Sequence, residues 1–102
     1  MAPFVKVALL ADVPPGQAKA VEAQGKEVAL FNVGGTLYAL DNICPHAGGP
    51  LAQGTVQGEQ VECPWHGACF NLKTGASSSP LAADGVGAYP VRVNGSDIEI
   101  EV

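Results

Sequence analysis

Two short stretches, Cys44-Pro45-His46-Ala47-Gly48-Gly49 and Cys63-Pro64-Trp65-His66-Gly67-Ala68, carry most of the information about the fold and chemistry of this chain. Each begins with Cys-Pro and offers one thiol and one imidazole, spaced Cys-x-His in the first and Cys-x-x-His in the second. Together they hold both histidines of the chain and two of its three cysteines. The sequence therefore predicts that the functional site is built from these two stretches.

The composition is that of one small globular domain. The chain has 102 residues, of which 47% are apolar and 15% charged, enough for a single modest core. Its net charge of -5 argues against a nucleic-acid partner, because binding phosphates requires clustered Lys and Arg. An acidic surface also suits docking to a basic patch on another protein. On composition alone, the favoured interpretation is that mild acidity keeps a small protein soluble.

The chain shows no sign of a membrane or secreted protein. No apolar run approaches the roughly 18 residues of a membrane span, and the first residues lack the pattern of a signal peptide. Three cysteines, an odd number, do not fit a disulfide framework and indicate a reducing compartment. We expect a cytoplasmic protein with no membrane association.

Short apolar runs between turn residues predict an all-β fold. Two hairpins are marked by Gln24-Gly25 and Asn94-Gly95, and the segment 76–87 is predicted to be a loop. Strands are expected at 4–10, 18–23, 27–32, 36–40, 60–62, 70–72, 88–93 and 97–102. The pattern favours about eight to ten antiparallel strands in a sandwich or small barrel.

Three kinds of chemistry could use the two stretches. Ordinary buried cysteines and surface histidines would not explain why every histidine follows a Cys-Pro at close spacing. A structural zinc site could use two Cys and two His, but zinc modules usually pair Cys with Cys and His with His. A [2Fe–2S] cluster in which two His replace two Cys on one iron suits two loops that each supply one Cys and one His. The mixed pairing favours the cluster.

The two stretches, with sixteen residues between His46 and Cys63, resemble the ligand signature of Rieske proteins. The likeness to small Rieske ferredoxins extends to Asp12-Val13-Pro14-Pro15-Gly16, Leu40-Asp41-Asn42 and Phe70-Asn71-Leu72-Lys73-Thr74-Gly75. It implies one Rieske domain over 1–102, made of stacked antiparallel sheets, with a small cluster-binding subdomain at about 43–82 inserted in the basal sheets. It also implies one [2Fe–2S] cluster, with Cys44 and Cys63 on the inner iron and His46 and His66 on the outer one.

The chain departs from respiratory Rieske proteins at four positions. Gly49 and Trp65 stand where those proteins have two bridging cysteines, and Ala68 and Phe70 stand where they have hydroxyl donors to the cluster sulfurs. Donors that stabilise the reduced cluster raise its potential, so their absence lowers it. We expect a potential of roughly -150 mV, near the low end of the Rieske range.

The resemblance implies an electron carrier and not an enzyme. Both histidines are assigned to the cluster, which leaves no imidazole for a second, mononuclear iron site or for a Ser-His arrangement. The expected role is to pass single electrons from an NAD(P)H-dependent flavoprotein reductase to the terminal oxygenase of an aromatic-ring dioxygenase. The alternatives are a small Rieske subunit of another NAD(P)H reductase, such as assimilatory nitrite reductase, and a structural zinc-binding module.

Three further residues carry weaker expectations. Cys69 is off the ligand spacing and is predicted to be a small core residue. Pro80 resembles the proline of a third loop that covers the cluster in this family, although a plain loop proline explains it nearly as well. Trp65 could shield the cluster or contact a partner, and the sequence does not separate these roles.

Overall fold

A computed structural model describes residues 4–43, 49–64, 68–77 and 85–101 of the chain. Within these ranges it forms ten strands and two three-residue 3-10 helices. The strands are β1 (Phe4–Leu9), β2 (Ala18–Ala23), β3 (Lys26–Val33), β4 (Thr36–Asp41), β5 (Thr55–Gln57), β6 (Gln60–Glu62), β7 (Cys69–Asn71), β8 (Ala88–Tyr89), β9 (Val91–Asn94) and β10 (Asp97–Glu101). The helices are η1 (Leu10–Asp12) and η2 (Leu51–Gln53). None of the helices in the described ranges is long and apolar enough to cross a membrane.

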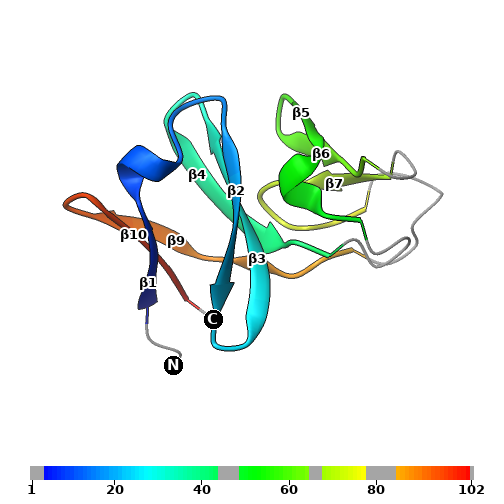
Figure 1. Ribbon diagram of the computed structural model, residues 1–102. Coiled ribbons are helices and arrows are strands. Elements are labelled where there is room, and N and C mark those ends of the chain that lie inside the picture. The colour runs from blue at the N-terminus through cyan, green and yellow to red at the C-terminus, as the bar shows by residue number, and fades with distance from the viewer. Residues whose placement is uncertain (1–3, 44–48, 65–67, 78–84, 102) are drawn as a thin grey trace.

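The strands form three antiparallel sheets that lie in layers (Figure 1). The first has the order β1-β10-β9, the second β2-β3-β4-β8 and the third β5-β6-β7. The four-stranded sheet lies between the other two, with the third sheet and η2 at one end of the molecule. The all-β prediction is confirmed, and the stacked sheets implied by the resemblance replace the single sandwich or barrel that the strand pattern alone favoured.

Strand β3 is buried on both faces because it runs through the middle layer. Alternate residues of a strand point to opposite faces, so Ala29 and Phe31 join the core shared with the third sheet. Val28 and Leu30 join the core shared with the first sheet. This explains why its sequence is a continuous apolar run and does not alternate with polar residues.

The hairpin turns follow the predicted positions with one shift. Gln24 and Gly25 form the centre of the β2–β3 turn with φ of 51° and 80°, as a two-residue turn with two positive φ angles requires. In the β9–β10 hairpin Asn94 pairs with Asp97, so the central residues are Gly95 and Ser96. The hairpin is therefore confirmed, but its turn begins one residue later than Asn94-Gly95 suggests.

The strand expected over 88–93 is two strands in two different sheets. Strand β8 pairs with β4 in the middle sheet, whereas β9 pairs with β10 in the outer one. Pro90 lies between them, and a proline has no N–H to continue a ladder of hydrogen bonds. The chain therefore changes sheet at Pro90, which the alternation of side chains does not reveal.

The chain leaves the middle sheet once and returns to it. It departs at the end of β4, builds η2 and the third sheet, and rejoins β4 through β8, where Leu40 pairs with Ala88. The third sheet includes β5, which was not expected because its segment is interrupted by glycines. Both Cys/His stretches lie in this excursion, between β4 and β8.

Candidate metal centre

Of the four predicted ligands, Cys63 lies within the described residues. It follows β6 directly and is only 1% exposed, in a core cluster that includes Val61 and Phe70. Cys44, His46 and His66 fall in 44–48 and 65–67, outside the described residues, as do Trp65 and Pro80.

The second Cys/His stretch connects two paired strands. Glu62 of β6 pairs with Cys69 of β7, and the Cys63 N–H donates to the carbonyl oxygen of Ala68 at 2.7 Å. This hydrogen bond closes the base of the connection and holds Cys63 against the core. The two ends of the stretch are therefore fixed, as the ends of a ligand-bearing segment need to be.

The first Cys/His stretch is closed by a buried asparagine. Asn42, two positions before Cys44, is only 1% exposed. Its carbonyl oxygen accepts a hydrogen bond from the Leu51 N–H at 2.7 Å. Its side-chain Oδ1 accepts from the Ala52 N–H at 2.9 Å, and an antiparallel bridge joins Ile43 to Pro50. Asn42 therefore ties the entry of this loop to its exit.

Asn42 also anchors the loop to the middle sheet. Its N–H donates to the carbonyl oxygen of Glu27 at 3.0 Å, and its Nδ2 donates to the carboxylate of the same residue at 3.2 Å. Each polar group of this buried residue thus has a partner, which is what burial of an amide requires. In the sequence Asn42 stands just beyond the strand expected at 36–40, and no local pattern indicates these contacts.

The two stretches end in one core. Leu51, just after the first stretch, and Cys63 and Ala68, at the ends of the second, all belong to the same buried cluster beneath the middle sheet. The structure therefore brings the bases of the two Cys/His stretches together, although thirteen residues, 50–62, separate them in sequence.

The segment 78–84 also starts and ends at this end of the molecule. Phe70 of β7 forms a bridge with Ser77, and the Val86 N–H donates to the Gly75 carbonyl oxygen at 2.8 Å. Gly75 has a φ of 76°, and a Cβ added to it would lie 2.0 Å from the Val86 carbonyl oxygen. Only glycine fits at position 75, where the chain before segment 78–84 crosses the chain after it.

We expect Gly75→Ala to destabilise the protein more than the strain of its positive φ alone would. The added methyl group meets the backbone of Val86, so the two chain segments must separate. Gly95→Ala is the matched control, because Gly95 has a φ of 65° but open space around it. Denaturant unfolding should show a loss for Gly75→Ala that exceeds that of Gly95→Ala by about 1–3 kcal/mol. Equal losses would contradict the tight crossing.

The donor set fits an iron–sulfur cluster with mixed ligands. Cys63 is the predicted ligand that the described residues include, and its thiol is buried; those residues contain no group of three or more His, Cys, Asp or Glu that could hold a metal ion. Ala68 and Phe70 are both fully buried beside it and carry no hydroxyl. Cys69 is half-buried and outside both core clusters, so the prediction that it is a core residue is wrong.

Comparison with known proteins gives one consistent result. A family model described as Rieske [2Fe-2S] domain matches residues 3–90. The chain is 35% identical over 100 residues to the ferredoxin component of the naphthalene 1,2-dioxygenase/salicylate 5-hydroxylase systems of Ralstonia sp, covering 97% of this chain and 95% of that protein. It is 43% identical over 94 residues to the 3-phenylpropionate/cinnamic acid dioxygenase ferredoxin subunit of Shigella boydii, covering 91% and 88%.

A solved structure shows the same fold. The ferredoxin of carbazole 1,9a-dioxygenase from Nocardioides aromaticivorans superposes with a TM-score of 0.90 at 34% identity, covering 98% of both chains. The agreement extends over all three sheets, because almost the whole of each chain is matched.

Proposed function

Because the chain belongs to the family of Rieske [2Fe–2S] domains, we propose that its two Cys/His stretches hold the cluster between them. The family carries one such cluster, which takes up and releases a single electron when bound. Cys44 and Cys63 would bind one iron, and His46 and His66 the other. What supports this assignment is the shared core at the bases of both stretches, where Cys63 is buried.

The described residues around Cys63 hold this ligand rigidly and exclude water from it. The hydrogen bond from the Cys63 N–H to the Ala68 carbonyl oxygen fixes the backbone of Cys63. Its side chain belongs to the same apolar core cluster as Phe70, so its sulfur is held in an apolar environment. A low-dielectric, pre-organised surround reduces the rearrangement that accompanies a change of charge. The domain proposed for 1–102, with the cluster-binding part at about 43–82, is consistent with the single excursion between β4 and β8.

The chain is an electron-transfer protein and not itself a catalyst, as its relatives are ferredoxin components of dioxygenase systems. We propose that it receives electrons from an NAD(P)H-dependent flavoprotein reductase and delivers them to a terminal oxygenase of the aromatic-ring dioxygenase type in the cytoplasm. Its net charge of -5 suits transient docking to basic surfaces on both partners. The family favours iron–sulfur chemistry over the structural zinc alternative.

A role in another NAD(P)H reductase, such as the small subunit of assimilatory nitrite reductase, is the second candidate. The ferredoxin components named above favour the oxygenase role, since they are 35% and 43% identical to this chain. The two roles differ in the acceptor. Chemically reduced holoprotein should be reoxidised rapidly by a dioxygenase terminal component; reoxidation by a nitrite reductase alone would reverse the assignment.

We expect a midpoint potential of roughly -150 mV, because neither Ala68 nor Phe70 can donate a hydrogen bond to the cluster sulfurs. Ala68→Ser should raise the potential by introducing a hydroxyl next to Cys63. Ala52→Ser, a partly buried alanine packed against the same core cluster, is the matched control. Redox titration followed by circular dichroism measures both variants. A wild-type midpoint well above zero would contradict the low-potential assignment.

A further inference from the structure

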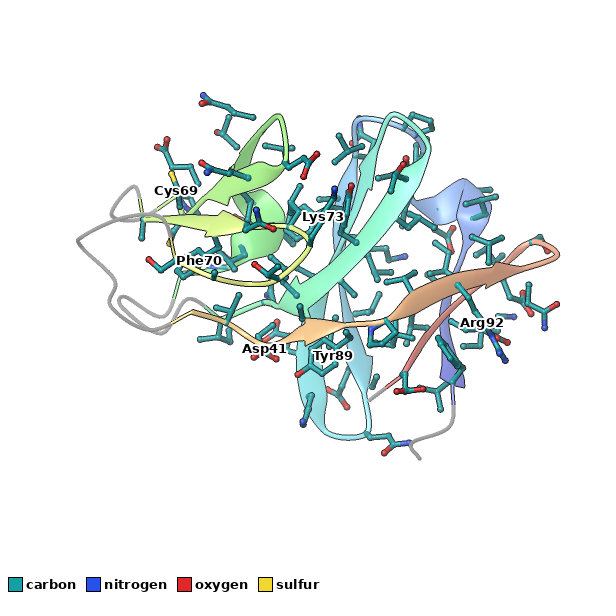
Figure 2. The ribbon with its side chains drawn as sticks, turned by 180° about the vertical axis from the view of Figure 1, so that it is seen from behind. Asp41, Cys69, Phe70, Lys73, Tyr89 and Arg92 are labelled. Carbon is teal, nitrogen blue, oxygen red and sulfur yellow. The ribbon has the colours of Figure 1, made fainter. Side chains whose placement is uncertain are left out.

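Asp41 joins the two chain segments that flank the candidate metal centre on the side of the middle sheet. It is the last residue of β4, three positions before Cys44. Its N–H donates to the Gly87 carbonyl oxygen at 2.9 Å, and its Oδ2 accepts from the Gly87 N–H at 2.8 Å. Its other carboxylate oxygen, Oδ1, accepts from the Tyr89 hydroxyl. Figure 2 shows Asp41 and Tyr89 side by side at the end of β8.

The three hydrogen bonds hold Asp41 in close contact with Gly87 and Tyr89. A Cβ added to Gly87 would lie 2.7 Å from the Asp41 Oδ2, so a larger residue there would displace the carboxylate. Burial, and then the hydrogen bond to Asp41, raise the pKa of Tyr89 to about 12. The phenol therefore stays protonated, and donates to Asp41, throughout the physiological range of pH.

The position of this contact matters because regular pairing ends there. The ladder between β4 and β8 has two residue pairs, Ala39 with Tyr89 and Leu40 with Ala88. Beyond it lie the chain after Asp41, which leads to 44–48, and the chain before Gly87, which comes from 78–84. Asp41 continues the pairing by one more residue through its backbone and its side chain together.

We propose that Asp41 is a positioning residue for the cluster: with Tyr89 and Gly87 it fixes the strand that leads to Cys44 and His46 against the segment that follows residue 84. The inference rests on the proposed function, since it needs the ligands to lie in the two stretches. A carboxylate that merely caps a strand end would affect folding stability alone. A positioning carboxylate also controls how firmly, and in what geometry, the cluster is held.

The chain offers a matched control for the charge and for the capping role. The Asp12 carboxylate accepts from the Leu9 N–H at 3.1 Å, at the end of β1, in a part of the chain remote in sequence from the Cys/His stretches. Asp12→Asn removes the same charge and weakens a hydrogen bond of the same kind. Asp41→Asn does so beside the candidate centre. Tyr89→Phe removes one donor to Asp41 without any change of charge.

The test measures release of the cluster from each holoprotein variant, by loss of visible absorbance in the presence of an iron chelator, well below the unfolding temperature. Asp41→Asn is expected to release it on the order of 10-fold faster than wild type, and Tyr89→Phe to change it in the same direction. Both should alter the g values of the rhombic EPR signal, which report ligand geometry. Asp12→Asn should match wild type in both measurements.

The inference is overturned if Asp41→Asn releases the cluster at the rate of Asp12→Asn with an unchanged EPR signal. If Asp41→Asn does not fold, Tyr89→Phe decides, and a wild-type release rate with wild-type g values overturns the inference. These results differ from failure of the proposed function, in which the wild-type protein would bind no cluster and show no EPR signal after reconstitution. That outcome would overturn the inference as well.

Discussion

Replacing Cys63 by serine is expected to abolish cluster binding. The thiol is buried at the closed base of the β6–β7 loop, and a serine hydroxyl at that position is a poor ligand for iron. The loss of affinity should exceed the roughly 10- to 100-fold that follows removal of a supporting residue. The purified variant should be colourless after anaerobic reconstitution, and iron analysis should find almost no metal bound.

Cys69→Ser is the matched control for this experiment. Cys69 lies in β7, six positions along the same hairpin, and is half-buried outside the core clusters. The Cys69→Ser protein should keep its colour and its iron, because Cys69 does not match the spacing of the ligands. If Cys63→Ser kept the cluster and Cys69→Ser lost it, the assignment of the second ligand stretch would be wrong.

Asn42→Ala is expected to lower the free energy of unfolding by about 2–4 kcal/mol. The substitution leaves the Ala52 N–H without its 2.9 Å acceptor and removes the donor to the Glu27 carboxylate. The Ala52 N–H is partly buried, so it bears a desolvation cost once its partner is lost. Because Asn42 also closes the first Cys/His stretch, the variant should release its cluster faster than wild type. Denaturant unfolding and the absorbance of the cluster measure the two effects.

Asn32→Ala separates the two effects of the Asn42 substitution. Asn32 is equally buried, and its amide also bridges two segments, donating to the Val13 carbonyl oxygen at 2.7 Å and accepting from the Gly35 N–H at 2.9 Å. Neither partner adjoins a Cys/His stretch. We expect a similar loss of stability with an unchanged rate of cluster release. Faster release in both variants would mean that it follows stability and not the closure of the first loop.

Features set by neighbouring residues could be predicted from the sequence. The paired spacing of Cys and His pointed to a mixed-ligand cluster, and the family match over residues 3–90 agrees with it. A strand was expected at 27–32, and β3 is found there, buried on both faces. The turn at Gln24-Gly25 could be predicted because Gly25, without a Cβ, adopts a positive φ at no steric cost.

Features that depend on distant partners could not be predicted in the same way. Asp41 and Asn42 read locally as the end of a strand, but their roles arise from contacts with Gly87, Tyr89 and Glu27. Pro90 separates two strands of different sheets because β4 and β10 lie on either side of it in space. A single sequence indicates the local conformation at each residue, but it does not show which distant residue will contact it.

The most direct test of the central claim is nitrogen hyperfine spectroscopy of the reduced protein labelled with ¹⁵N-histidine. The chain has two histidines, His46 and His66, so every labelled imidazole belongs to a proposed ligand. Pulsed EPR should show two strongly coupled ¹⁵N nuclei on a rhombic [2Fe–2S] signal. A spectrum with one such coupling, or none, would contradict a cluster held by both Cys/His stretches.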